Sequence, residues 1–150
     1  MKISVLCFDL SNNSFGRAWL LARALSKFYD VEIIGSSKRD GIWSPMEQTS
    51  IPVKQFPWKR YPGFFKTTKN IIEAIDGDVV LASKLMPTSF GIGLKKKYSS
   101  GKPLILDIDD WELGFFYHSG FFGRIGRFLN FSNPNALPYV WRMEHLVGYA

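Results

Sequence analysis

Short apolar runs alternate along this chain with stretches in which apolar residues recur every three or four positions. The runs predict buried strands, and the recurring pattern predicts helices that pack by one face. This alternation predicts a doubly wound parallel sheet of the Rossmann-like α/β class, with right-handed crossovers. The expected strands are Lys2–Leu10, Val31–Gly35, Ile51–Phe56, Val79–Ala82 and Leu104–Ile108.

The first expected helix follows a polar turn and carries a shallow apolar stripe that suits close packing on a sheet. Phe28 is expected to extend it by one turn. The stripe consists of Ala18, Leu21, Ala22 and Leu25. Further helices are expected at Phe64–Ile75, from about Thr88 to Tyr98, and at Ala136–Tyr149, with a loop at Ser36–Ser50.

Length and composition indicate one domain with a real core, because the chain has 150 residues of which 46% are hydrophobic. Its single cysteine, Cys7, excludes an internal disulfide and indicates a small buried hydrophobe. No apolar run approaches the roughly 20 residues that span a bilayer. We therefore expect a cytoplasmic protein.

The net charge of +6 is unevenly distributed. Two long stretches, Gln48–Ile72 and Leu113–Met143, contain no acidic residue and are dense in aromatic and basic side chains. Such a mixture suits either nucleic acid or an anionic membrane surface. Nucleic-acid affinity would fall steeply with salt.

The segment Gly77–Glu112 carries the strongest functional signal. It reads as strand, helix and strand, and the second apolar run ends in Asp107, Asp109 and Asp110. Ligands of open parallel sheets bind beyond the carboxyl ends of the strands. We expect the chemistry at this acid cluster.

Two other polar positions are expected on the same side of the sheet. Gly16 and Arg17 begin a helix, whose N-terminus favours an anion, although neither the dinucleotide fingerprint nor the phosphate loop is present. Lys84 lies just past a strand end. The alternatives are structural: Gly16 eases a turn, and Arg17 and Lys84 are solvated.

The acid cluster has three interpretations, of which two come from local pattern. The acids could form only a loop and a helix cap. Alternatively, an apolar strand followed by DxD is similar to haloacid-dehalogenase-like phosphatases, with Asp107 as nucleophile, Asp109 as acid/base and magnesium between them. Trp111 stands where that family has a small residue.

The third interpretation uses the whole chain. The opening strand, the loop and helix at Asn12–Leu25, the segments DVVLASKLMPTSFGIGL and GKPLILDIDDWE, and the closing WRMEHLVGYA occur in this order. Together they resemble the N-terminal domain of GT-B glycosyltransferases of the glycosyl transferase group 1 family. The resemblance implies sugar transfer from a nucleotide-diphosphate sugar to a carbohydrate or lipid-linked acceptor, in cell-envelope or polysaccharide synthesis. It implies no cofactor and no metal.

The resemblance also implies roles for individual residues. The loop Ser14-Phe15-Gly16-Arg17 would lie near the acceptor and the donor phosphates, and Lys84 near acceptor oxygens. Asp109 and Asp110 would be catalytic, next to the reacting sugar, with Asp109 where the family often has a histidine. A second, C-terminal domain would hold the donor. Residues 1–150 are therefore expected to be an incomplete acceptor-binding domain, inactive alone.

Lipid-linked acceptors imply a peripheral position on the inner face of the cell membrane. Alternatively, the basic and aromatic stretch Leu113–Ser132 packs over the cleft or against the second domain. A further alternative is that the chain is a non-enzymatic module that binds membrane or nucleic acid. Nucleic acid is the less favoured partner. The expected membrane-contact residues are Phe115, Phe116, Phe121, Phe122, Arg124, Arg127 and Phe128.

Overall fold

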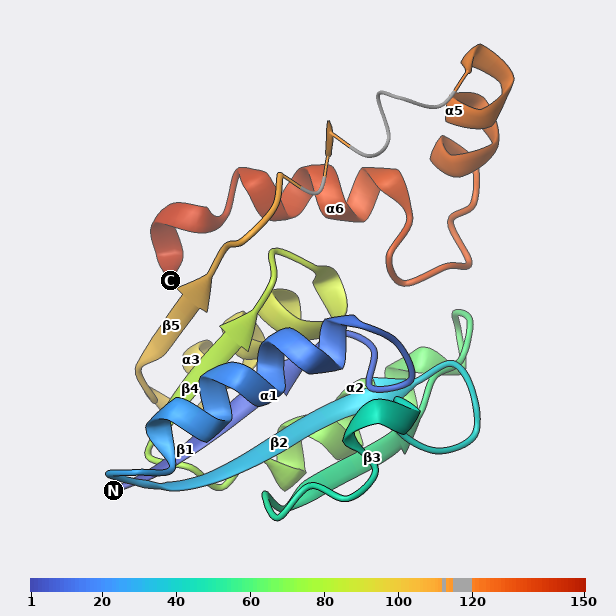
Figure 1. The fold of residues 1–150 in the computed structure, drawn as a ribbon. Helices are drawn as coiled ribbons and strands as arrows, with labels where there is room; N and C mark the ends of the chain where they lie inside the picture. Colours follow the sequence, from blue (N-terminus) through green and yellow to red (C-terminus); the bar gives the residue numbers. More distant parts are fainter. Residues whose placement is uncertain (112, 115–119) are drawn as a thin grey trace.

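The chain forms one parallel sheet with helices on both faces, which confirms the predicted α/β, Rossmann-like class (Figure 1). The computed structural model describes residues 1–111, 113–114 and 120–150. The strand order is β3-β2-β1-β4-β5, so the direction of strand addition reverses between β1 and β4. The strands are β1 (Lys2–Cys7), β2 (Asp30–Ser37), β3 (Val53–Pro57), β4 (Val79–Ser83) and β5 (Leu104–Asp107).

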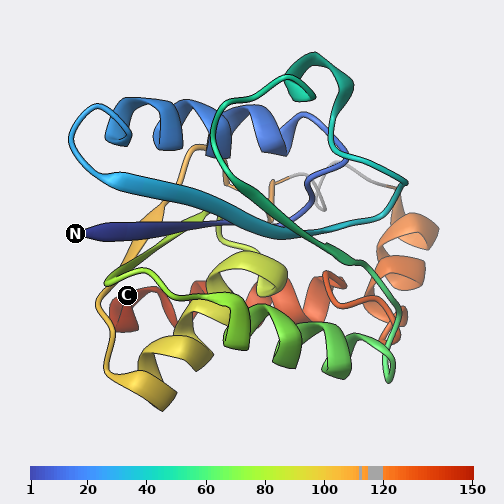
Figure 2. The same ribbon diagram turned by 90° about the horizontal axis from the view of Figure 1, so that it is seen from below.

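The helices form a layer on each face of the sheet (Figure 2). Helix α1 and the short 3₁₀ helix η1 lie on one side, and α2, η2, α3 and α6 lie on the other. Helix α5 stands away from the sheet (Figure 1). The bounds are α1 (Ser14–Leu25), η1 (Ser44–Met46), α2 (Phe64–Ala74), η2 (Pro87–Gly91, a π-helical turn), α3 (Ile92–Ser100), α5 (Phe121–Phe128), α6 (Leu137–Glu144) and η3 (Val147–Tyr149).

Each face of the sheet has its own apolar core. On the α1 side, Val5, Ile33 and Phe15 are fully buried. On the other side, Leu6 and Phe90 lie in a second cluster with side chains from α2, α3 and α6. The central strands are therefore covered on both faces, as their continuous apolar runs predict.

Three details of the predicted elements are wrong. Helix α1 ends at Leu25, because the chain turns there to enter β2, and this leaves Phe28 79% exposed. Strand β5 is not covered on both faces, since Ile105 is 52% and Ile108 50% exposed. The closing helix is broken after Glu144, and only a 3₁₀ turn follows.

Smaller differences concern boundaries. Strand β1 is shorter than expected and β2 longer, and η1 lies within the expected loop. The predicted helix from about Thr88 to Tyr98 begins as the π-helical turn η2 and continues as α3 to Ser100. It ends at Gly101, whose φ of 70° is the left-handed conformation common just beyond a helix end.

Candidate functional site at the carboxyl edge of the sheet

The carboxyl ends of all five strands meet at one edge, here called the carboxyl edge, and the loop after β1 is built there around Asp9. The carboxylate of Asp9, 1% exposed, accepts hydrogen bonds from the Ser11 N–H at 3.0 Å and the Ser11 hydroxyl at 2.6 Å. It also accepts one from Asn12 Nδ2 at 2.9 Å. Asp9 was not predicted as a site residue, although the sequence Asp9-Leu10-Ser11-Asn12 after a strand is typical of such a turn.

The start of α1 offers less to a ligand than the resemblance implies. Phe15 is fully buried, so its side chain is a core residue and the candidate site excludes it. The Ser14 hydroxyl donates to the Asp9 carbonyl or to Asn12 Oδ1, both at 2.7 Å. Gly16 lies against Trp43, since an added Cβ would come within 3.1 Å of that ring. These three residues therefore shape the loop.

Arg17 joins α1 to β5. Its Nε and Nη2 donate to the two oxygens of Asp107, at 2.9 and 2.6 Å. Such a bidentate pair is geometrically specific, and the hydrogen bond to Asp107 raises the pKa of Arg17. The first loop and the last strand, 90 residues apart in sequence, thus lie at the same edge.

Lys84 and the two remaining acids form a second ion-pair group. The Lys84 ammonium lies 3.2 Å from Asp109 Oδ1 and 3.0 Å from Asp110 Oδ2. Its backbone has a φ of 73°, a conformation that costs a non-glycine residue free energy, and strain of this kind often occurs at functional sites. Lys84 therefore contacts the predicted catalytic acids directly.

Several buried polar atoms near the carboxyl ends of β2, β3 and β4 have no hydrogen-bond partner among the described residues. Since buried polar groups are nearly always paired, each such atom is a candidate ligand contact. These atoms are the hydroxyl oxygens of Ser36, Ser37 and Ser83 and the indole nitrogen of Trp58.

A hollow of about 420 Å³, lined by two of these residues, Ser37 and Trp58, lies at the ends of β2 and β3. The ammonium of Lys38 sits 5.5 Å from the centre of the Trp58 ring and 3.7 Å from Asp9 Oδ2, which links the hollow to the loop after β1. Its walls are Ser37, Lys38, Arg39, Asp40, Gln55, Phe56, Pro57 and Trp58. An aromatic face surrounded by hydroxyl, amide and charged groups is suited to polar, ring-shaped ligands.

The comparisons with known proteins give no family. No protein-family model matches the chain, and no curated protein matches it.

The pairing of the acids bears on the phosphatase alternative. Its nucleophile would be Asp107, but both oxygens of Asp107 accept hydrogen bonds from Arg17, while Asp109 pairs with Lys84. No group of His, Cys, Asp and Glu side chains within the described ranges is arranged to hold a metal ion. The local geometry thus does not support that chemistry.

Cys7, at the end of β1, is also unsuited to catalysis. It is 1% exposed, and burial raises the pKa of its thiol to about 12. The thiolate is therefore essentially absent at neutral pH. The interpretation of Cys7 as a small buried hydrophobe is confirmed.

The expected membrane-contact residues lie only partly within the described structure. Phe115, Phe116 and the side chains of Phe121 and Arg124 fall outside it. In the described part, Phe122 is 87% and Phe128 47% exposed, and Arg127 lies on the same helix, α5. Among the residues described, no helix is long and apolar enough to cross a bilayer.

Proposed function

We propose that this chain is the acceptor-binding part of a GT-B sugar transferase that uses a nucleotide-diphosphate sugar. One observation carries the proposal: the Arg17–Asp107 pair brings the first turn of α1 and the acids at the end of β5 together at the carboxyl edge. This edge flanks the reversal of strand order between β1 and β4, the usual ligand position in such sheets.

The proposed roles follow from charge and position. Asp109 and Asp110 would accept hydrogen bonds from sugar hydroxyls, and one of them would take the proton of the attacking hydroxyl. Lys84, 3.0–3.2 Å from both, would hold their orientation and turn to substrate oxygens when a sugar enters. Arg17, still 39% exposed beside Asp107, would lie next to phosphate. The donor itself would bind to a second domain.

The decisive test is a transfer assay on the full natural protein. Radiolabelled sugar from UDP-glucose, UDP-N-acetylglucosamine or GDP-mannose is offered with membrane-lipid and oligosaccharide acceptors, and labelled product is counted. Asp109→Asn and Asp110→Asn together should lower the rate at least 100-fold, a size typical of acid–base residues. Asp30→Asn, the same change at the exposed start of β2 on the opposite edge, is the matched control.

The outcomes separate the parts of the proposal. Transfer that persists in the double variant would remove the two acids from the mechanism. Absence of transfer from every donor would contradict sugar transfer as the function.

A second candidate function, attachment to an anionic membrane, is favoured by α5 and the residues just after it. Large apolar side chains are exposed there together: Phe122, Ile125, Phe128, Leu129 and Phe131. Arg127 adds a positive charge. A helix that combines such a face with basic residues binds at the membrane interface.

Liposome flotation tests this attachment. Phe122→Ser with Phe128→Ser should reduce binding to phosphatidylglycerol vesicles by about 100-fold or more, because each buried aromatic contributes roughly 2 kcal/mol. Phe28→Ser, just beyond the end of α1 and 79% exposed, is the control. Equal loss in the control, or binding to nucleic acid instead of vesicles at matched salt, would contradict membrane attachment through α5.

A further inference from the structure

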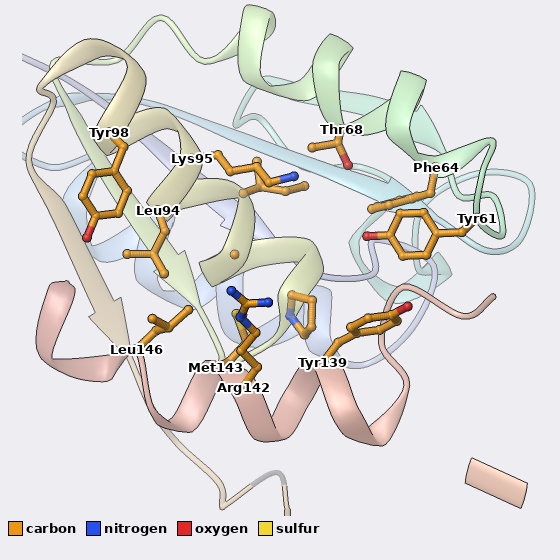
Figure 3. A pocket seen from close by; sticks show the side chains of 13 residues that line it. Tyr61, Phe64, Thr68, Leu94, Lys95, Tyr98, Tyr139, Arg142, Met143 and Leu146 are labelled. Atoms are coloured by element: carbon orange, nitrogen blue, oxygen red, sulfur yellow. The ribbon is translucent and has the colours of Figure 1, made fainter. Parts of the chain in front are cut away.

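A pocket of about 350 Å³ lies on the other face of the sheet, between α2, α3 and α6 (Figure 3). None of the residues of the carboxyl-edge site lines it. Its floor is apolar and firmly packed, since Phe64 is 2%, Leu94 5% and Met143 8% exposed. A volume and lining of this kind suit one small ligand or part of a larger one.

Two cations project into this pocket from opposite sides. Lys95 comes from α3 and Arg142 from α6, and both point toward the space between the helices (Figure 3). No acidic residue lines the pocket, and Glu144 on α6 is not part of its wall. Neither cation has an ion-pair partner among the described residues.

Polar groups without charge complete the mouth of the pocket. The Tyr61 hydroxyl and Thr68 face the same space (Figure 3). Burial raises the pKa of Tyr61, so this hydroxyl stays protonated and can donate a hydrogen bond. Tyr61 packs edge-on against Phe64 and Tyr139, with ring centres 5.9 and 5.8 Å away, and this fixes its ring.

We propose that this pocket binds a lipid phosphate monoester, with its phosphate between Lys95 and Arg142 and the first part of its hydrocarbon chain on the apolar floor. The charges match, because a phosphate monoester carries about −1.5 to −2 at neutral pH and two cations face it. Arg is the side chain best shaped to bind phosphate through two parallel hydrogen bonds. The proposal is independent of sugar transfer at the carboxyl edge.

Isothermal titration of the chain with farnesyl phosphate, below its micelle concentration, tests the proposal. Lys95→Gln with Arg142→Gln should weaken binding at least 10-fold, and added salt should weaken binding to the wild type. Lys27→Gln with Arg23→Gln changes the same charges on the opposite face, at the end of α1, and should leave the affinity unchanged. Leu146→Trp, which narrows the pocket, should abolish binding while thermal denaturation shows a folded protein.

Three probes decide between ligand chemistries. Farnesol that binds as well as farnesyl phosphate would overturn recognition of the anion, and inorganic phosphate that binds as well would overturn recognition of the chain. Absence of binding by farnesyl phosphate would overturn the proposal as a whole. Asp109→Asn should leave this affinity unchanged, so failure of the sugar-transfer proposal and failure of this one are distinguishable.

Discussion

The two edges of the sheet carry similar charges but use them differently. At the amino edge, where the strands begin, the carboxylate of Glu32 is 3% exposed and lies 3.1 Å from Lys2 Nζ and 2.8 Å from Lys54 Nζ. The hydroxyl of Ser4 donates to it at 2.7 Å. Asp76 completes the group, 2.7 Å from Lys2. No polar atom of this edge, within the described ranges, is buried without a partner.

At the carboxyl edge the hydrogen bonding among the described residues is incomplete. Lys84 has a strained backbone there, and the hydroxyls of Ser36, Ser37 and Ser83, which have no partner in the described part of the chain, lie at strand ends. The difference indicates that the amino edge serves stability and the carboxyl edge is available for ligands. A buried charge needs several partners to be tolerated, whereas a binding group must be able to exchange partners.

The largest effect on stability is expected at the amino edge. Glu32→Ala leaves two lysines and a buried hydroxyl without their shared partner and should lower the free energy of unfolding by about 2–4 kcal/mol. Urea denaturation measures it. Asp109→Asn, at the carboxyl edge, should cost about 1 kcal/mol or less, because its pair is partly exposed. Equal losses would show that the two edges do not differ in this way.

The Arg17–Asp107 pair is expected to make an intermediate contribution to the free energy of unfolding. It is bidentate, but Arg17 is 39% and Asp107 17% exposed. A double-mutant cycle with Arg17→Ala and Asp107→Ala should give a coupling free energy of about 1 kcal/mol in urea denaturation. A coupling near zero would mean that other packing holds the first loop beside β5.

The strain at Lys84 can be measured apart from its charge. Lys84→Gly and Lys84→Ala both remove the ammonium, but only glycine adopts a φ of 73° without steric cost. The glycine variant should therefore be more stable by about 1 kcal/mol. Equal stability of the two variants would show that the positive φ stores no free energy.

The smallest expected effect is the pH dependence of stability that comes from Asp76 at the amino edge. The hydrogen bond from Lys2 is the first cause that holds the pKa of Asp76 well below its usual 3.8. The stabilisation that ionised Asp76 contributes is therefore complete above about pH 3.8, the ordinary pKa, and is lost as the pH falls from there toward the pKa of the folded state. The difference in melting temperature between wild type and Asp76→Asn should shrink below pH 3.8. A difference that stays constant would contradict the linkage.

The sequence is most informative where burial is continuous. All five strands were predicted. The apolar runs of β1, β2 and β4 are largely buried and leave little ambiguity, whereas β3 and β5, at the ends of the sheet, are only partly buried. Placing Asp107, Asp109 and Asp110 after a parallel strand also predicted their edge of the sheet. The direction in which a side chain points is decided by tertiary packing, however. For this reason the burial of Phe15 was not predicted.

Contacts between segments distant in the sequence could not be predicted from sequence patterns. Nothing local to Arg17 indicates that its partner is Asp107, and Lys95 and Arg142 line the same pocket only because α3 and α6 cover the same face. The break in the closing helix after Glu144 was not predicted, because the apolar pattern continues past it. The backbone nevertheless tightens into a 3₁₀ turn that contains Gly148, a weak helix former.

The outer side of β5 has a consequence for handling the protein. Strand β3, at the other end of the sheet, is flanked by Pro52 and ends in Pro57, and proline discourages the addition of another strand. Strand β5 is also preceded by a proline, Pro103, but contains none, and Ile105 and the adjacent Ile108 are exposed to solvent. Concentrated solutions should therefore scatter light through edge-to-edge association of copies, unless another polypeptide segment shields this strand.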